Sequence, residues 1–173
     1  MSIPWYERED FKEELESFGR ALQGSKPYEV VIETNAEKCR SAQCNFTAGR
    51  IVVNPTFFPG LPEAQHLVTK ALLVHEAGHR RYSTPESLPT LVREVANILE
   101  DERVDRRMCQ EFSGAGWFLR KLAEVFYEGV SPVNGASDSP GEIVGYFLQL
   151  RWAIRIGKPI KGCTRKGKVN KIY

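Results

Sequence analysis

Two histidines four residues apart lie inside a long helical pattern, and they constrain the fold more than any other feature. Residues 62–81 carry apolar side chains at helical spacing, and Pro62 stands in the first turn, where its missing N–H costs nothing. An HExxH pattern runs from His75 to His79 within this stretch. Four residues advance a helix by slightly more than one turn, so both imidazoles project from one face, about 40° apart.

The HExxH pattern has the spacing of a zinc site. Two imidazoles on one face of a helix can both reach a tetrahedral zinc ion at about 2.1 Å. Glu76 lies about 100° further around the helix, beside the metal but not bound to it. There its carboxylate can take a proton from water and deliver it to a leaving amine. The pattern can arise by chance, but its place on a helix that follows a strand favours a metal site.

The third zinc ligand is not expected to be a histidine. Catalytic zinc sites usually have three protein ligands and one water. The remaining histidine, His66, stands nine residues before His75, about 180° around the same helix, so we interpret it as a surface or packing residue. The elongated metzincin motif is absent, because Tyr82 and Pro85 occupy the places of its glycine and its third histidine. A carboxylate must therefore complete the site.

The next expected helix carries an acidic cluster that offers this carboxylate. The candidates are Glu94, Glu100, Asp101, Glu102 and Asp105. Asn97, Asp101 and Asp105 follow one another at intervals of four along one helix face. If Asp101 binds zinc, Asp105 can hold the N–H of a ligand histidine, which resembles the ExxxD arrangement of gluzincins with aspartate in place of glutamate. Glu100 has Val104 at the equivalent offset, so we favour Asp101 over Glu100 as the ligand.

The two motifs together resemble a known family. The matching residues are His75, Glu76, His79, Asn97, Glu100, Asp101, Arg103, Val104 and Asp105. They are similar to the metallopeptidase-like domains of bacterial and phage proteins that accompany von Willebrand A domains, as in cobalt-chelatase subunits and nitric-oxide-reductase activators. The similarity covers roughly residues 50–110 and implies a zincin. Because fewer than 70 residues follow residue 110, we expect no von Willebrand domain there and therefore a free-standing zincin rather than a chelatase-type accessory role.

The pattern along the chain predicts an α+β fold. The expected elements are a helix at 6–23, a strand at 28–34, a hairpin at 46–54, and helices at 62–81, about 87–112, 117–128 and 140–156. We expect a zincin-like domain over 1–157, with a small antiparallel sheet, a further helical bundle and a basic tail at 158–173. The strand at 50–54 is expected to be an edge strand beside the active-site helix. It would pair there with extended substrate, although a purely structural hairpin is equally compatible.

Composition limits the possible partners and the compartment. The chain has 173 residues, a net charge of +2 and four cysteines without a CxxC pair, and no apolar run approaches the roughly 20 residues that span a bilayer. The N-terminus has no apolar stretch typical of a secretory signal. We therefore expect a cytoplasmic protein without a membrane partner. The basic tail could touch nucleic acid, but a solvated tail is the simpler interpretation; no oligomeric state is predicted.

These features lead to two functional hypotheses from different classes. The first is a zinc metallopeptidase acting on a peptide or protein substrate, with His75, His79 and Asp101 as metal ligands and Glu76 as general base. The second is a catalytically silent, zinc-stabilised regulatory or phage protein-interaction module. Arg103 could stabilise the oxyanion in the first hypothesis, although an ion pair with Glu100 or Glu102 is the simpler role. The substrate cannot be read from the sequence.

Overall fold

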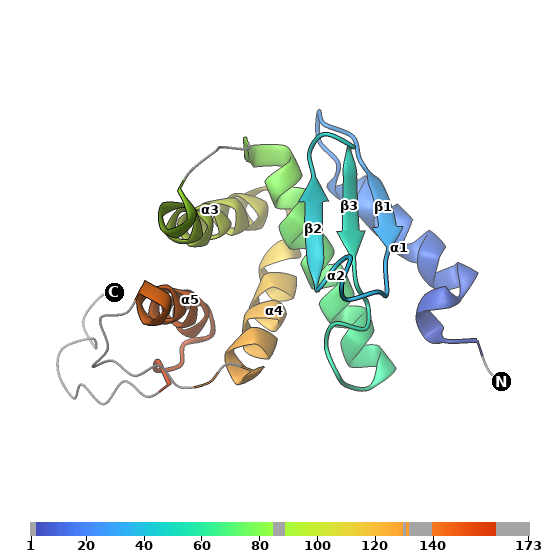
Figure 1. Cartoon of the computed structure of the whole chain (residues 1–173). Coiled ribbons are helices and arrows are strands. Elements are labelled where there is room, and N and C mark those ends of the chain that lie inside the picture. Colours follow the sequence, from blue (N-terminus) through green and yellow to red (C-terminus); the bar gives the residue numbers. More distant parts are fainter. Residues whose placement is uncertain (1–2, 85–88, 130, 132–139, 162–173) are drawn as a thin grey trace.

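In the computed structural model, four helices and a small sheet surround one central helix (Figure 1). The structure describes residues 3–84, 89–129, 131 and 140–161. The elements are a 3-10 turn Trp5–Glu7, α1 Glu9–Leu22, β1 Glu29–Ile32, β2 Ala42–Asn45, β3 Arg50–Val53, α2 Pro62–Tyr82, α3 Thr90–Glu111, α4 Ala115–Gly129 and α5 Pro140–Ile156. The predicted α+β class is confirmed. The expected bounds of the helices agree with these ranges to within a few residues.

Helix α2 is the centre of the fold. Its buried residues include Ala71, Leu72, Leu73, Val74 and Ala77, which cover more than one helix face. A helix that is apolar on several faces must be packed on several sides. The sheet and α1 cover one side of α2, and α3 and α4 cover the other, with α5 packed on α3 and α4 (Figure 1). The segment that contains both histidines is therefore held by neighbours along its whole length.

The sheet is mixed, which corrects the expected antiparallel arrangement. Its order is β1-β3-β2, with β1 parallel to β3 and β2 antiparallel to β3. The hairpin between β2 and β3 turns through Gly49, whose φ of 62° suits glycine, and the Asn45 side chain accepts a hydrogen bond from the Ala48 N–H. The strand that begins at Ala42 lies outside the predicted hairpin range of 46–54.

The strand predicted to be the edge is instead the central strand. Ile51 and Val53 of β3 are fully buried, and β3 has a partner on each side. The edge strand next to α2 and the histidines is β2. The continuous apolar run from Ile51 to Val53 is typical of a strand paired on both sides, so the signal for a central strand was present in the sequence.

Gly78 lets α2 and α3 approach closely. A Cβ at this position would lie 2.5 Å from Val104 Cγ1 and 2.8 Å from Met108 Cγ. Both neighbours are fully buried in α3. The contact stands inside the HExxH pattern, so the same stretch that carries the histidines also sets their distance from the acidic face of α3.

The structure describes only the first part of the segment that was expected to form a basic C-terminal tail. Lys158 pairs with Glu128 of α4 at 2.6 Å, and Lys161 donates to the Glu128 carbonyl at 3.1 Å. The remainder of the expected basic tail, residues 162–173, lies outside the described residues. Among the described helices none has an apolar segment of the length that crossing a membrane requires.

Candidate metal centre

Helices α2 and α3 bring three potential ligand atoms together. His75 Nε2 and His79 Nε2 lie 3.2 Å apart, and Asp101 Oδ1 lies 3.0 Å from His79 Nε2 and 3.7 Å from His75 Nε2. Ligands at about 2.0–2.1 Å from a tetrahedral zinc ion are separated by roughly 3.3–3.4 Å. The triangle therefore has the size that zinc requires. These three residues are the one group of potential metal ligands found in the described part of the chain.

The second nitrogen of each histidine is already engaged by protein. His75 Nδ1 lies 2.8 Å from Asp105 Oδ1, and a carboxylate can only accept, so Nδ1 carries the proton. His79 Nδ1 lies 3.0 Å from Ser83 Oγ, whose own proton is donated to Glu100 at 2.5 Å. His79 Nδ1 therefore also carries a proton. This leaves both Nε2 atoms to face the centre, which is the arrangement of metal-ligating histidines.

Two arginines of α5 hold the carboxylates of α3. Arg151 Nη1 donates to Asp101 Oδ2 at 3.1 Å, and its other terminal nitrogen donates to Asp105 Oδ2. Arg155 donates to the same Asp105 oxygen at 2.5 Å and to Glu102 at 2.8 Å. Asp101 therefore presents only Oδ1 to the histidines. Each of these arginine side chains is less than one-fifth exposed, so the pairs are weakly screened by solvent.

The sequence interpretation missed these arginines. They lie four residues apart in α5, a helix whose remaining side chains are mostly apolar. Two cations on one face of an apolar helix predict a buried ionic partner, because isolated buried charges are costly. That signal could have identified both residues, although it could not have named their carboxylate partners.

The charges of the centre shift the pKa values of its members. Burial by itself lowers the pKa of His75, but the charge and hydrogen bond of Asp105, with the charges of Asp101 and Glu76, raise it to about 9. Burial raises the pKa of Asp101 and Asp105, but the histidines and Arg151 outweigh it, and both pKa values fall below the usual aspartate range. The carboxylates are thus ionised at neutral pH, as a metal ligand and its partner must be.

Glu76 lies beside the three ligand atoms and does not join them. Burial raises the pKa of Glu76, and the charges of His75 and His79 act in the opposite direction without cancelling this effect. The backbone N–H of Cys44 in β2 also acts to lower the pKa of Glu76. The edge strand of the sheet thus reaches the same place as the HExxH carboxylate.

Glu100 does not lie among the ligand atoms. It accepts hydrogen bonds from Ser83 and Arg103, both at 2.5 Å. The hydrogen bonds from Arg103 lower the pKa of Glu100 to about 2, in spite of the opposing effect of burial, and Ser83 adds to the shift. Through Ser83 it supports His79, which is a role that the helix-face argument did not find. Arg103 also donates to the Tyr82 carbonyl at 2.8 Å, so it forms the ion pair rather than facing the centre.

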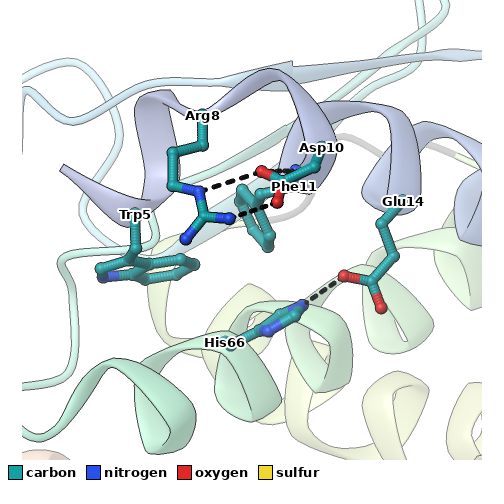
Figure 2. Close-up of a pocket in the computed structure, with 6 residues that line it drawn as sticks. All are labelled: Trp5, Arg8, Asp10, Phe11, Glu14 and His66. Carbon is teal, nitrogen blue, oxygen red and sulfur yellow. Dashed lines mark hydrogen bonds and ion pairs between the residues drawn. The ribbon is translucent and has the colours of Figure 1, made fainter. Parts of the chain in front are cut away.

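The third histidine lies away from the centre, where α1 crosses α2. Figure 2 shows His66 pointing toward Glu14, with its Nε2 at 3.0 Å from Glu14 Oε2. The rings of Phe11 and Trp5 lie beside it, with centroids at 4.8 and 5.8 Å. The structure thus places it in a contact between the two helices, separate from His75 and His79.

A cavity of about 160 Å³ opens next to the centre. Part of its wall is polar and consists of Ser41, His75, Glu76, Asp101, Asp105, Arg151 and Arg155. The remainder is apolar and consists of Leu72, Leu119, Leu122, Ala123, Phe126, Leu148 and Trp152. A pocket that combines apolar side chains with converging polar groups is a common form of ligand site.

Comparison of the chain with models of protein families, with curated proteins and with solved structures finds no match. The geometry of the centre, its charges and the cavity beside it are therefore the observations on which a function can be proposed.

Proposed function

We propose that the chain is a zinc-dependent metallopeptidase. His75, His79 and Asp101 would hold the metal. One observation carries the proposal. Three ligand atoms from α2 and α3 form a triangle with sides of 3.0 to 3.7 Å, while protein groups hold the Nδ1 atoms of both histidines. When bound, zinc supplies a Lewis acid that polarises a carbonyl and lowers the pKa of water to about 7.

Glu76 is the general base of the proposed reaction. It takes a proton from the attacking water and delivers it to the nitrogen of the leaving amine. Its raised pKa supports this role, because a base works best when its pKa lies near the operating pH.

The free edge of β2 supports a peptide as the substrate. The Ser41 carbonyl accepts a hydrogen bond from the Asn54 N–H, so the pairing with β3 alternates and the backbone groups of Ala42 and Cys44 point away from β3. An extended peptide can pair with such an edge. It would then pass directly beside Glu76. The edge strand of the proposal is therefore β2 rather than the predicted strand at 50–54.

The proposal agrees with the resemblance of the two motifs to the metallopeptidase-like domains that accompany von Willebrand A domains. In the ExxxD arrangement of gluzincins, the second helix supplies a ligand and, four residues later, a partner for a ligand histidine. Asp101 and Asp105 lie in these two places, with Asp105 at 2.8 Å from His75. The zincin-like character of the fold thus belongs to this proposal and rests on the same contacts.

The test separates metal binding from hydrolysis. The zinc-loaded chain is incubated with a mixed peptide library, and new termini are identified by mass spectrometry. Glu76→Gln should keep one zinc per chain and lower cleavage by about 100-fold or more, because it removes the base without removing a ligand. Glu63→Gln, at an exposed position on the same helix, serves as the control and should leave zinc content and peptide cleavage unchanged. Full cleavage by Glu76→Gln would rule out the proposed mechanism.

A zinc-stabilised module without turnover is the second candidate. It is favoured by the ionic network of Asp101, Asp105, Glu102, Arg151 and Arg155, which joins α3 to α5 and lies directly against the metal centre. A metal held there would also tie α2 to both helices. This candidate predicts one zinc per chain and a large loss of thermal stability with a chelator. It predicts no cleavage of any peptide, which distinguishes it from the peptidase.

A further inference from the structure

The cavity beside the metal centre is divided between charged and apolar walls. Its charged wall contains the proposed ligands and Glu76. Its apolar wall combines three helices: Leu72 comes from α2, Leu122, Ala123 and Phe126 from α4, and Leu148 and Trp152 from α5. The charged wall belongs to the proposed reaction, whereas nothing in that reaction requires the apolar wall.

The size of the cavity matches one apolar side chain. Its volume is about 160 Å³, and a cavity of about 150 Å³ lined by leucine, isoleucine and phenylalanine is known to hold benzene. Phe126 and Trp152 stack with ring centroids 5.2 Å apart and form an aromatic part of the wall. A second aromatic ring packs favourably against such a wall in an offset or edge-to-face orientation.

The position of the cavity relates it to the bond that would be cut. Ser41, which directly precedes β2, lines the cavity together with His75 and Glu76. A peptide paired with the edge of β2 would therefore run past the entrance. A side chain next to the reacting carbonyl is the part of such a peptide that lies closest to both the metal ligands and the apolar wall.

We propose that the apolar part of this cavity is a specificity pocket that takes one phenyl-sized or leucyl-sized side chain of the substrate, from the residue adjacent to the scissile bond. This inference rests on the proposed function, because it assigns a substrate class to the same site. The arginines on the charged wall do not contradict it. Arg151 and Arg155 are engaged by Asp101, Asp105 and Glu102, so they do not select an acidic side chain.

The experiment uses two hydroxamates and the zinc-loaded chain. Acetohydroxamic acid carries a methyl group, and 3-phenylpropanohydroxamic acid carries a phenyl group on a short linker, while both bind zinc through the same atoms. The phenyl compound should bind more tightly by about 10- to 100-fold, the gain expected from burying one aromatic side chain. Equal affinities of the two compounds would overturn the inference.

Two variants on α5 locate the effect. Leu148→Trp fills the cavity from a partly buried position, so it should abolish the difference in affinity between the two compounds. Ile154→Trp is the matched control, because Ile154 is 57% exposed and does not line the cavity. Circular dichroism and zinc content verify that both variants are folded and loaded. A preference for the phenyl compound that survives Leu148→Trp would also overturn the inference.

Failure of the proposed function gives a different result. If the chain binds no zinc, the proposed metal centre is contradicted. The pocket is then tested in the metal-free chain with toluene. Methyl NMR signals of Leu148 and Ala123 should then shift with toluene, and Leu148→Trp should remove the shift of Ala123. No shift in the wild-type chain would contradict the pocket. If zinc binds and the phenyl compound is preferred but no peptide is cut, the result supports the proposed pocket and contradicts the proposed peptidase function.

Discussion

His66 and His75 of helix α2 each contact a carboxylate, but their surroundings differ. His66 lies 3.0 Å from Glu14, and His75 lies 2.8 Å from Asp105. Four residues after His66 stands Lys70, which also binds Glu14, whereas four residues after His75 stands His79. The same helical spacing thus adds a competing cation beside His66 and a second proposed metal ligand beside His75.

The two regions also differ in the sign of their electrostatic effect. Burial lowers the pKa of His66, and the charge of Lys70 adds to this, so the attraction of Glu14 does not reverse it. Around His75 three carboxylates outweigh burial and raise the pKa. A contact between a histidine and a carboxylate therefore does not identify a metal site. The proposed metal centre rests instead on the convergence of two ring nitrogens and a carboxylate oxygen on one point.

The largest expected effect distinguishes Asp101 from Glu14. Asp101→Asn removes the anionic ligand, so it should weaken zinc binding by more than about 100-fold, beyond the range known for residues that only support ligands. Glu14→Gln changes the carboxylate beside His66 in the same way and should leave zinc binding unchanged. Competition with a chromophoric chelator measures both affinities. Similar losses in the two variants would show that the two regions do not differ as described.

A smaller effect is expected for the partner of His75. Asp105→Asn should weaken zinc binding by about 10- to 100-fold, because the Nδ1 proton of His75 loses its charged acceptor. Asp105 is 1% exposed and accepts from two arginines, so the variant should also lower the free energy of unfolding by about 3–5 kcal/mol. Chelator competition and urea unfolding give the two values. An unchanged zinc affinity would contradict the supporting role of Asp105.

The smallest effect is the opposite pH response of the two histidines in the metal-free chain. His75 binds its proton more tightly in the folded state, so its contribution to stability is fully present below the unfolded pKa of about 6.5 and is lost as the pH rises through about 9. His66 has a lowered pKa, so its protonation below about 6.5 disfavours the fold. NMR titration of the imidazole C–H signals measures both midpoints. If His66 and His75 titrated with the same midpoint, the predicted opposite shifts of their pKa values would be contradicted.

Periodic patterns in the sequence predicted most of the helices and part of the candidate metal centre. The helix at 140–156 coincides with α5, and the helix at 62–81 differs from α2 by one residue. Helical periodicity also placed Asp101 and Asp105 on one face, and the structure brings that face to the histidines. These features depend on residues within a few turns of each other, which is why the sequence pattern contains them.

Contacts between distant segments could not be predicted in the same way. The parallel pairing of β1 with β3 joins Glu29 to Arg50, and no periodicity within either strand specifies that partner. Similarly, Arg151 of α5 meets Asp101 across 50 residues of chain. The link from His79 through Ser83 to Glu100 depends on how α2 ends and α3 begins. Such contacts follow from the packing of whole helices.

A crystal structure of the zinc-loaded chain, with anomalous scattering recorded at the zinc edge, tests the central claim most directly. We expect one zinc ion at about 2.0–2.2 Å from His75 Nε2, His79 Nε2 and an oxygen of Asp101, with solvent in the remaining place. Zinc bound instead at His66 and Glu14, or a centre closed by a fourth protein ligand, would contradict the account.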